Sequence, residues 1–569
     1  SAIVGGNPPQ AAGYGLADKI LGRDNVSVAF FGDGSTQNGA SYEAINIAGA
    51  HGLPTIFFIE NNMMGVSTRL EEVTRETRLS SRGAMLGVPS IRVDGMDIVA
   101  VHLAMQEARE IISRGEGPVV VEAMVYRHFH QSSDKLGSDL GYRTKEEEAE
   151  WWAKDGVLRT EARLREMGLL DDATFARIND LVSGSVLSAA KQVTETKPGS
   201  NALQIRESLW PDPETVDSGI LGDLSEMQDA QFLDHADLPN LETEKVKLVT
   251  AASEVLVSAM QRDPTIVIYG EDVHKMRGGV SGMTKGVIET FPDRIMPMPI
   301  AENGFTGLAL GAALNGLRPV AEIMFGDFCF TAADQIAHGA GKARHMFGGD
   351  FPVPVVLRVR IAPHTGYGSQ HSCDPSALFD LFPGWRIFSP TTAFDYIGMM
   401  NAALRCNDPV AIIEHTGLYQ KSHLVPKGNR DYCIPFGKAH VVRPGSACTV
   451  LATSTMVEAS VKAAKEADID AEVIDVRNTD VHGLDWDLIG ASIAKTGRVM
   501  IAEETASSMS LAGRWAGEIQ ERFFDMLDFE VLRVTGSLSA PTVSRVLNEA
   551  AIASKDDVVR GMKRLTKFA

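Results

Sequence analysis

The chain of 569 residues has few cysteines, no long apolar run and a deficit of positive charge. Its five cysteines are scattered, which argues against a disulfide framework or a zinc site and indicates a reducing compartment. No apolar run approaches the roughly 20 residues that a membrane span needs. The net charge of −20 argues against nucleic acid and anionic membranes as partners, because both would repel the chain.

Buried parallel strands are predicted where short runs are apolar on both faces. In residues 1–195 these runs are Val26–Phe31, Thr55–Ile59 and Val119–Val125, and a helix-length segment, Ser41–Ala50, lies between the first two. This order is typical of a strand-helix-strand unit with parallel strands and a right-handed connection. The first domain is therefore predicted to be α/β.

The same alternation occurs twice more after an irregular segment. Residues 196–244 combine Pro-Gly turns with acidic stretches and show no strong periodicity, which predicts a linker or a wrapping arm. A second domain is predicted over residues 245–435 and a third over residues 436–569. Their predicted strands are Thr265–Tyr269, Val320–Met324, Val353–Val359, Thr449–Thr453, Ala471–Val476 and Val499–Ala502. The fold class is α/β, with three doubly wound domains.

Two polar turns follow the first two predicted strands. Asp33 stands in a Gly-Asp-Gly turn after the first strand, and Asn62 ends an Asn-Asn pair after the second. In open α/β sheets ligands bind beyond the carboxyl ends of the strands, so these side chains are expected to converge. Carboxylate, amide and main-chain oxygens suit Mg²⁺, and the amides of Gly34 and Ser35 lead into a helix start that favours phosphate. The sequence therefore predicts a magnesium-diphosphate site.

Each turn alone is more typical of an ordinary loop than of a binding site. The paired arrangement is more specific and resembles the signature of thiamine diphosphate enzymes. Apart from the linker, the chain resembles the thiamine-dependent first component of 2-oxo acid dehydrogenase complexes, of the pyruvate, branched-chain and acetoin types. Residues 1–195 resemble its alpha subunit and residues 245–569 its beta subunit, fused in one chain.

The resemblance implies thiamine diphosphate and Mg²⁺ as cofactors and assigns residues to them. In the alpha-like part it implies Asp33, Asn62 and the main-chain carbonyl of Met64 as the magnesium ligands. Ala2 and Val4, in AIVGGNPPQAAG, match the segment that lies against the aminopyrimidine ring.

The stretch YRHFHQSSDKLGSDLGYRTKEEEAEWW resembles the alpha subunit's phosphate-side loop. The resemblance places His130 at the position of a histidine that contacts the cofactor and is a candidate catalytic residue. Where relatives often carry His-Ser, this chain has His130 and Gln131, which leaves kinase control at that position undecided; Ser132 and Ser133 follow.

In the beta-like part, the resemblance assigns residues to the pyrimidine side of the cofactor. Glu302, in PIAENGFTGLALGAAL, matches the glutamate that bonds a pyrimidine ring nitrogen and favours the imino tautomer, and Glu271, in GEDV, matches another acidic position. Phe328 matches an aromatic residue that stacks on the aminopyrimidine, and His371, in YGSQHS, matches a histidine at the substrate end. His364 matches no family position. Taken alone, Glu302 is more typical of a helix cap and Phe328 of a core residue.

The implied reaction is the oxidative decarboxylation of a small 2-oxo acid, with transfer of the acyl group to a lipoyl group on a partner dihydrolipoyl acyltransferase. The third domain resembles the beta subunit's C-terminal domain, which supports assembly, and no catalytic cluster is predicted in it. The resemblance also implies a homodimer of fused chains, with each site formed either within one chain or between two.

Three alternatives stay open at the level of sequence. An acetoin-cleaving dehydrogenase component would carry the same motifs. Transketolases have the same three domains in the same order, although YRTKEEEAEWW, the long linker, GEDV and SQHS favour the dehydrogenase component. A non-catalytic scaffold would be expected to have lost Asp33, Asn62 or Glu302, and all three are present.

The first residues of the chain match the middle of the family's alpha-subunit pattern. We therefore expect a preceding part that holds further diphosphate and substrate residues, and weak or no turnover from this form alone. The expected location is the bacterial cytoplasm or, with a leader, an organelle matrix.

Overall fold

The computed structural model describes residues 2–567. The chain forms two compact units. Of the described residues, the larger consists of residues 2–27, 40–54 and 219–567, and the smaller consists of residues 28–39 and 55–218. Within the described residues, none of the helices combines the length and the apolar character that a bilayer span requires.

The sheet of the smaller unit has four strands in the order β1-β2-β6-β5. They are β1 (Ser27–Gly32), β2 (Thr55–Asn61), β6 (Val119–Met124) and β5 (Ser90–Asp94). Strand β6 is parallel to both β2 and β5, as expected for runs that are apolar on both faces. The three predicted strands are present. Strand β5 was not predicted, because its sequence SIRVD is only partly buried and carries two charges.

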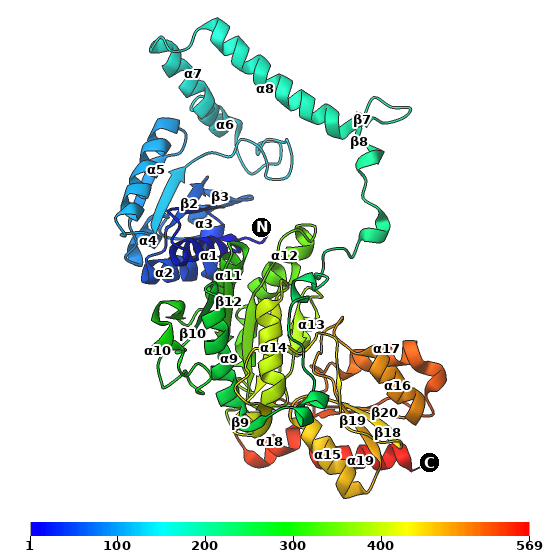
Figure 1. Cartoon of the computed structure of the whole chain (residues 1–569). Coiled ribbons are helices and arrows are strands. Elements are labelled where there is room, and N and C mark those ends of the chain that lie inside the picture. The colour runs from blue at the N-terminus through cyan, green and yellow to red at the C-terminus, as the bar shows by residue number, and fades with distance from the viewer. Residues whose placement is uncertain (1, 568–569) are drawn as a thin grey trace. The chain divides into compact units, whose positions relative to one another are not determined.

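The helices of the smaller unit lie between the strands of this sheet and after its last strand in sequence. They are α3 (Leu70–Val73), α4 (Ser81–Met85), α5 (Ile98–Ser113), α6 (Lys145–Trp152), α7 (Gly156–Glu166) and α8 (Asp172–Val193), with hairpins β3 (Met64–Gly65)–β4 (Thr68–Arg69) and β7 (Thr194–Thr196)–β8 (Leu203–Ile205). No residue of α7 or α8 is buried, and α8 extends as a long cyan arm in Figure 1.

A six-stranded parallel sheet, the basis of what we call the second domain, lies in the larger unit. Its order is β11-β10-β12-β13-β15-β14. The strands are β10 (Ile266–Gly270), β11 (Ile295–Pro297), β12 (Arg318–Ile323), β13 (Val356–Ile361), β14 (Arg386–Phe388) and β15 (Val410–His415). Helices α9 (Leu248–Arg262) and α14 (Ala393–Arg405) share one hydrophobic core with these strands. The domain also contains α10 (Val287–Thr290), α11 (Glu302–Leu314), α12 (Gly341–Met346) and α13 (Ser376–Asp380).

A five-stranded sheet forms what we call the third domain, in the order β17-β19-β18-β20-β21. The strands are β17 (His440–Arg443), β18 (Cys448–Ala452), β19 (Ala471–Asp475), β20 (Val499–Ala506) and β21 (Leu532–Gly536). Helices α15 (Thr455–Ala467) and α19 (Lys555–Thr566) share a core with one face, and α16 (Trp486–Thr496) and α17 (Ala512–Phe523) with the other. Helix α18 (Arg545–Ala551) precedes α19. The doubly wound arrangement predicted here is present.

The first helix of the chain, α1 (Asn7–Ile20), packs along α11 of the second domain. Their backbones approach too closely for side chains. A Cβ at Gly13 would lie 2.2 Å from the Leu308 carbonyl oxygen, and one at Gly311 would lie 1.9 Å from the Gln10 carbonyl oxygen. Glycine is required at both contacts because any larger residue would force the helices apart. The following helix, α2 (Gly39–His51), contributes Glu43 to the same unit.

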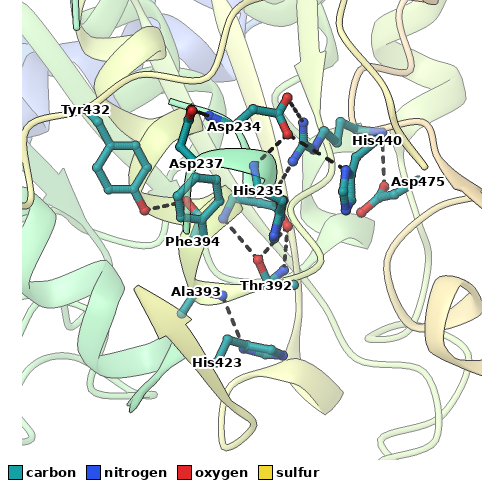
Figure 2. A network of polar contacts seen from close by, with 12 residues as sticks. Asp234, His235, Asp237, Thr392, Ala393, Phe394, His423, Tyr432, His440 and Asp475 are labelled. Carbon is teal, nitrogen blue, oxygen red and sulfur yellow. Dashed lines mark hydrogen bonds and ion pairs between the residues drawn. The ribbon is translucent and has the colours of Figure 1, made fainter. Parts of the chain in front are cut away.

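The second half of the predicted linker lies against the second domain. Strand β9 (Thr243–Lys247) pairs with β16 (Ser422–Pro426), and the amide of Leu233 donates to the Cys433 carbonyl at 3.0 Å. Figure 2 shows His235 of this segment beside Phe394 and His440. Asp395, at the start of α14, joins three parts of the unit. Its carboxylate accepts from His235 at 3.1 Å and from the fully buried Arg477 of the third domain at 2.8 Å. This segment is therefore a wrapping arm held by buried charge.

Candidate active site

The turns that follow β1 and β2 lie side by side. A Cβ added at Gly34 would lie only 3.9 Å from the Cα of Gly65, so the two turns meet at the carboxyl edge of the sheet. Asp33 is 2% exposed, and its carbonyl accepts from the hydroxyl of Thr36 at 2.6 Å. Gly34 and Ser35 open a single 3-10 turn, Ser35–Gln37, immediately before α2.

The two consecutive asparagines have different surroundings. The amide nitrogen of Asn61 donates to Glu122 at 2.8 Å, and its oxygen accepts from the amide of Met63 at 3.0 Å, so this side chain is fully used inside the fold. The Oδ1 of Asn62 is buried and has no hydrogen-bond partner among the described residues. A buried amide oxygen without a donor is costly and is typical of a position that a ligand completes. Met64, two residues on, is 2% exposed.

Asp33 is set in an environment that makes an ionised carboxylate costly without a cation. Burial raises the pKa of Asp33, and hydrogen bonds from the backbone together with the guanidinium groups of Arg127 and Arg82 offset only part of that rise. Neither arginine was singled out from the sequence, because no motif spacing connects residue 33 with residues 82 and 127. A divalent cation at this carboxylate would favour the ionised form.

His130 lies in the loop between β6 and α6. Its amide donates to the carbonyl of Lys135 at 2.8 Å, and its Nδ1 lies 3.3 Å from the Tyr142 hydroxyl, so the ring is half-buried and oriented by Tyr142. Ser132 and Ser133 in the same loop are exposed.

An aromatic stack that the sequence analysis missed supports this loop. His128 stacks on Trp152 with ring centroids 3.8 Å apart, Tyr126 stacks on Trp151 at 4.9 Å, and the Arg143 guanidinium lies 3.9 Å from the centre of the Tyr126 ring. The two consecutive tryptophans at the end of α6 were the available signal. Trp151 and Trp152 contact Tyr126 and His128, where the loop begins.

Three carboxyl groups gather at the start of α11. Glu302 is its first residue and is 7% exposed, and Glu271, which follows β10, is 6% exposed. Burial, followed by the negative charge of Glu302, raises the pKa of Glu271 to about 7. Glu43 from α2, which the sequence analysis did not identify, accepts from the amide of Gly304 at 2.7 Å. Since Glu43 caps this amide, Glu302 is not needed as a cap.

Phe328 and His371 belong to one aromatic cluster. The His371 ring meets the edges of Phe325 and Phe328 with centroids 4.8 and 5.3 Å apart. Phe328 is half-buried, so it is not an ordinary core residue, and Phe325 carries the Arg360 guanidinium at 4.1 Å. The cluster orients the His371 ring, and the sequence identified only two of its members.

Ala2 and Val4 precede α1 and are exposed, Val4 to 60%. They belong to the larger unit, as do Glu271, Glu302, Phe328 and His371, whereas Asp33, Gly34, Ser35, Asn62, Met64 and His130 belong to the smaller unit. The predicted site residues are thus divided between the two units.

Comparison with known proteins gives matches along almost the whole chain. Residues 1–201 match the family model described as dehydrogenase E1 component, residues 244–421 match the transketolase pyrimidine-binding domain, and residues 437–558 match the transketolase C-terminal domain. The acetoin:2,6-dichlorophenolindophenol oxidoreductase subunit beta of Cupriavidus necator is 33% identical over 336 residues, which are 57% of this chain and 98% of that protein. The chain belongs to the dehydrogenase E1 component family.

Other proteins have similar sequence identity to the chain. The corresponding acetoin subunit of Bacillus subtilis is 34% identical and covers 55% of this chain and 95% of itself, and the mitochondrial pyruvate dehydrogenase E1 subunit beta-1 of Arabidopsis thaliana is 34% identical over 55% and 87%. A solved structure titled split gene transketolase, inactive beta4 tetramer, has 22% identity and a TM-score of 0.46 over 57% of this chain and 98% of that one.

These matches confirm the predicted family, enzyme class and α/β fold. The chain is an E1 component of the 2-oxo acid and acetoin dehydrogenase type, and this family is thiamine diphosphate-dependent. The relatives named above are beta subunits, whereas residues 1–201 match the E1 component model, so this one chain carries an alpha-like and a beta-like part.

The donor set beyond β1 and β2 fits Mg²⁺ better than a transition metal. Among the described residues, no group of three or more His, Cys, Asp and Glu side chains could hold a metal ion. Asp33, the Asn62 amide oxygen and a main-chain carbonyl instead offer only hard oxygen ligands. Such a site leaves the remaining positions of an octahedral ion to phosphate and water.

Proposed function

We propose that this E1 component decarboxylates a small 2-oxo acid with thiamine diphosphate and Mg²⁺ and passes the acyl group to a lipoyl group on a partner dihydrolipoyl acyltransferase. The observation that carries the proposal is the pair of adjacent turns beyond β1 and β2, where Asp33 is buried and the Asn62 Oδ1 lacks a partner. When bound, thiamine diphosphate supplies the electron sink for decarboxylation.

On the diphosphate side, residues of the smaller unit hold the charged end of the cofactor. Asp33, Asn62 and the carbonyl of Met64 hold Mg²⁺, while Gly34 and Ser35 present main-chain amides to phosphate. His130, oriented by Tyr142, contributes a ring nitrogen near the phosphate or the substrate. The buried surroundings of Asp33 strengthen its attraction for the cation, because water screens the interaction less.

On the pyrimidine side, residues of the larger unit handle protons. Glu302 would bond the pyrimidine ring nitrogen of the bound cofactor, and Glu271, with a pKa raised to about 7, would support it as a neighbour that can hold a proton. Phe328 would stack on the ring, Ala2 and Val4 would lie against it, and His371 would serve the substrate end as a proton donor or acceptor. Carboxyl groups held close together share protons readily, which suits this task.

The proposed assembly and location are based on the relatives. They are named as components and subunits of dehydrogenases, from bacteria, mitochondria and chloroplasts. We accordingly propose a homodimer of fused chains, in the bacterial cytoplasm or an organelle matrix, with domains over residues 1–195, 245–435 and 436–569 and a linker over residues 196–244.

The test is a substrate panel on the full-length protein with thiamine diphosphate and Mg²⁺. Pyruvate, 2-oxoisovalerate and acetoin are compared by specificity constant, using reduction of 2,6-dichlorophenolindophenol. We expect one of the 2-oxo acids to be preferred and Glu302→Ala to abolish turnover with all three. Ketol transfer between sugar phosphates, without dye reduction, would contradict the proposal and support transketolase chemistry.

Acetoin cleavage is a second candidate. It is favoured by the 33–34% identity to two acetoin:2,6-dichlorophenolindophenol oxidoreductase beta subunits, over 95–98% of their length. The same panel separates it from the first candidate, because acetoin would then give the highest specificity constant and the same dependence on Glu302.

A further inference from the structure

The loop that carries His371 is mostly exposed. It follows β13, and between the buried Pro363 and the buried Ser372 only Gly368 is buried. Gly366 and Gly368 have φ of +75° and +85°, and His364 itself has φ of 66°, a conformation that side chains other than glycine rarely adopt. A contact with a residue outside the loop would favour this conformation of His364.

The third domain supplies that contact. His364 Nε2 lies in contact with Oε1 of Glu504, a residue of β20. The other oxygen of Glu504 accepts from His415 Nε2 at 2.6 Å and from the Thr455 hydroxyl at 3.1 Å. The Glu504 carboxylate therefore binds the loop with one oxygen and is itself held by the other.

His415 is a fixed support for this carboxylate. It ends β15, its side chain is 2% exposed, and its Nδ1 accepts from the amide of Gly417 at 2.9 Å. Because Nδ1 accepts, Nε2 carries the proton that is donated to Glu504. The carboxylate is 12% exposed, whereas His364 on the loop is 46% exposed. Exposure thus increases from His415 at the end of a buried strand, through Glu504, to His364 on the loop.

The charges of the cluster favour an ion pair. Burial alone would raise the pKa of Glu504, but the two histidines outweigh it and hold the pKa well below its usual range. The hydrogen bond to Glu504 raises the pKa of His364 against the opposing effect of burial. Asp374 and Glu549 are the other acidic groups that act on these residues, and Lys555 lines the same cavity. A charge-assisted bond of this kind is stronger than a neutral one.

Two cavities border the contact between His364 and Glu504. One, of about 430 Å³, is lined by His364, His415 and Glu504, and the other, of about 230 Å³, by Ser369, Ser372 and Glu504. Glu504 forms part of the wall of both. At the far end of the loop, the amide of Cys373 donates to Asp327 at 2.9 Å. Besides the ring contacts of Tyr367 and His371 with Phe325, the loop thus has polar contacts near both ends, and the one with Glu504 lies nearer its start.

We propose that Glu504 is a positioning residue for the reaction: it fixes the loop through His364 and so sets the place of His371. This assigns the third domain a part in the active site, where the sequence predicted no catalytic cluster. The inference rests on the proposed function, because His371 is a candidate catalytic residue only within it.

The test compares Glu504→Gln and His364→Asn with a matched control, Glu458→Gln. Glu458 of α15 pairs with Lys421, so its ion pair also joins the third domain to the second but does not touch the loop. Asparagine tolerates the left-handed backbone of position 364 yet is too short to reach the carboxylate. We expect kcat per bound cofactor to fall about ten-fold in both loop variants, with KM and cofactor affinity nearly unchanged. The double variant should be no worse than either single one.

Hydrogen exchange of the peptide spanning residues 363–372, measured without substrate, separates this inference from the proposed function. Faster exchange in Glu504→Gln and His364→Asn than in Glu458→Gln supports the inference even if the wild type turns over none of the three substrates. Equal exchange in all three variants, or an unchanged kcat in an active enzyme, would overturn it. If Glu504→Gln fails to fold, His364→Asn, on the exposed side of the contact, decides alone.

Discussion

The two candidate cofactor-binding regions are built differently. Beyond β1 and β2 the groups come from short turns, and Asp33 has two guanidinium groups near it. At the start of α11 the carboxyl groups of Glu43, Glu271 and Glu302 come from three separate segments, and every influence on the pKa of Glu271 raises it. In the first region Asp33 is suited to be ionised beside a bound cation. In the second region Glu271 is suited to be protonated.

The strongest test of this difference is Glu302→Gln. Glutamine keeps the volume but cannot exchange the proton, so turnover per bound cofactor should fall by about 10³-fold. The affinity for thiamine diphosphate and Mg²⁺ should change little, because the diphosphate region is intact. Dye reduction and titration calorimetry measure the two quantities. Weak binding with normal turnover would show that Glu302 is a binding group only.

The asparagine pair offers a matched comparison. We expect Asn62→Ala to weaken Mg²⁺-assisted cofactor binding by about 10–100-fold, as for other groups around a metal. It should leave stability unchanged, because the Oδ1 has no partner within residues 2–567. Asn61→Ala should instead lower the free energy of unfolding by about 2 kcal/mol, since it removes one donor to the buried Glu122 and leaves the Met63 amide without its acceptor. Titration calorimetry measures cofactor binding, and urea denaturation measures the free energy of unfolding. Equal effects of the two substitutions on both quantities would contradict the different roles of Asn61 and Asn62.

Glu271 should make stability depend on pH. Its pKa is raised to about 7, so the folded protein binds a proton that the unfolded chain releases near pH 4.5. That contribution is complete below pH 4.5 and is lost as the pH rises through 7. Glu271→Gln should therefore flatten the profile and be about 1–2 kcal/mol more stable than the wild type at pH 8, relative to pH 5. Parallel profiles from urea denaturation would contradict this.

The smallest effect is expected for Glu43→Ala. It removes the acceptor for the Gly304 amide at the start of α11. The free energy of unfolding should fall by about 1 kcal/mol, through the loss of one charge-assisted bond near a helix start. Urea denaturation measures it, with the exposed Glu289→Ala on α10 as the control. No change would mean that water replaces the carboxylate.

The sequence predicted the strands where local apolar patterns decide the structure. The prediction for β13 began at Val353, but the strand starts at Val356 although Val353 and Val355 are buried. Pro354 has no amide hydrogen to donate to a neighbouring strand, which accounts for the later start. Strand β15 was missed because it contains Glu414. That charge is paired with Arg358 of β13 at 2.7 Å, a partner that the local sequence does not reveal.

Some residues of the candidate site could also be predicted from local sequence, and others could not. Asp33 and Asn62 were identified because each stands at a strand end within a short motif. Glu43, Arg127 and Glu504 act on residues far away in the chain, and no motif spacing connects them with those residues. Their contribution depends on tertiary contacts, which a single sequence does not specify.

The close contact between α1 and α11 has a consequence for biosynthesis. Gly13 and Gly311 are almost 300 positions apart, so the first helix leaves the ribosome long before the surface it packs on has been translated. Until then the apolar face of α1 lacks the helix on which it packs. The emerging polypeptide depends on chaperones or on temporary local packing to avoid aggregation. Carrying both parts in one polypeptide ensures that the missing surface always arrives, in equal number and close by.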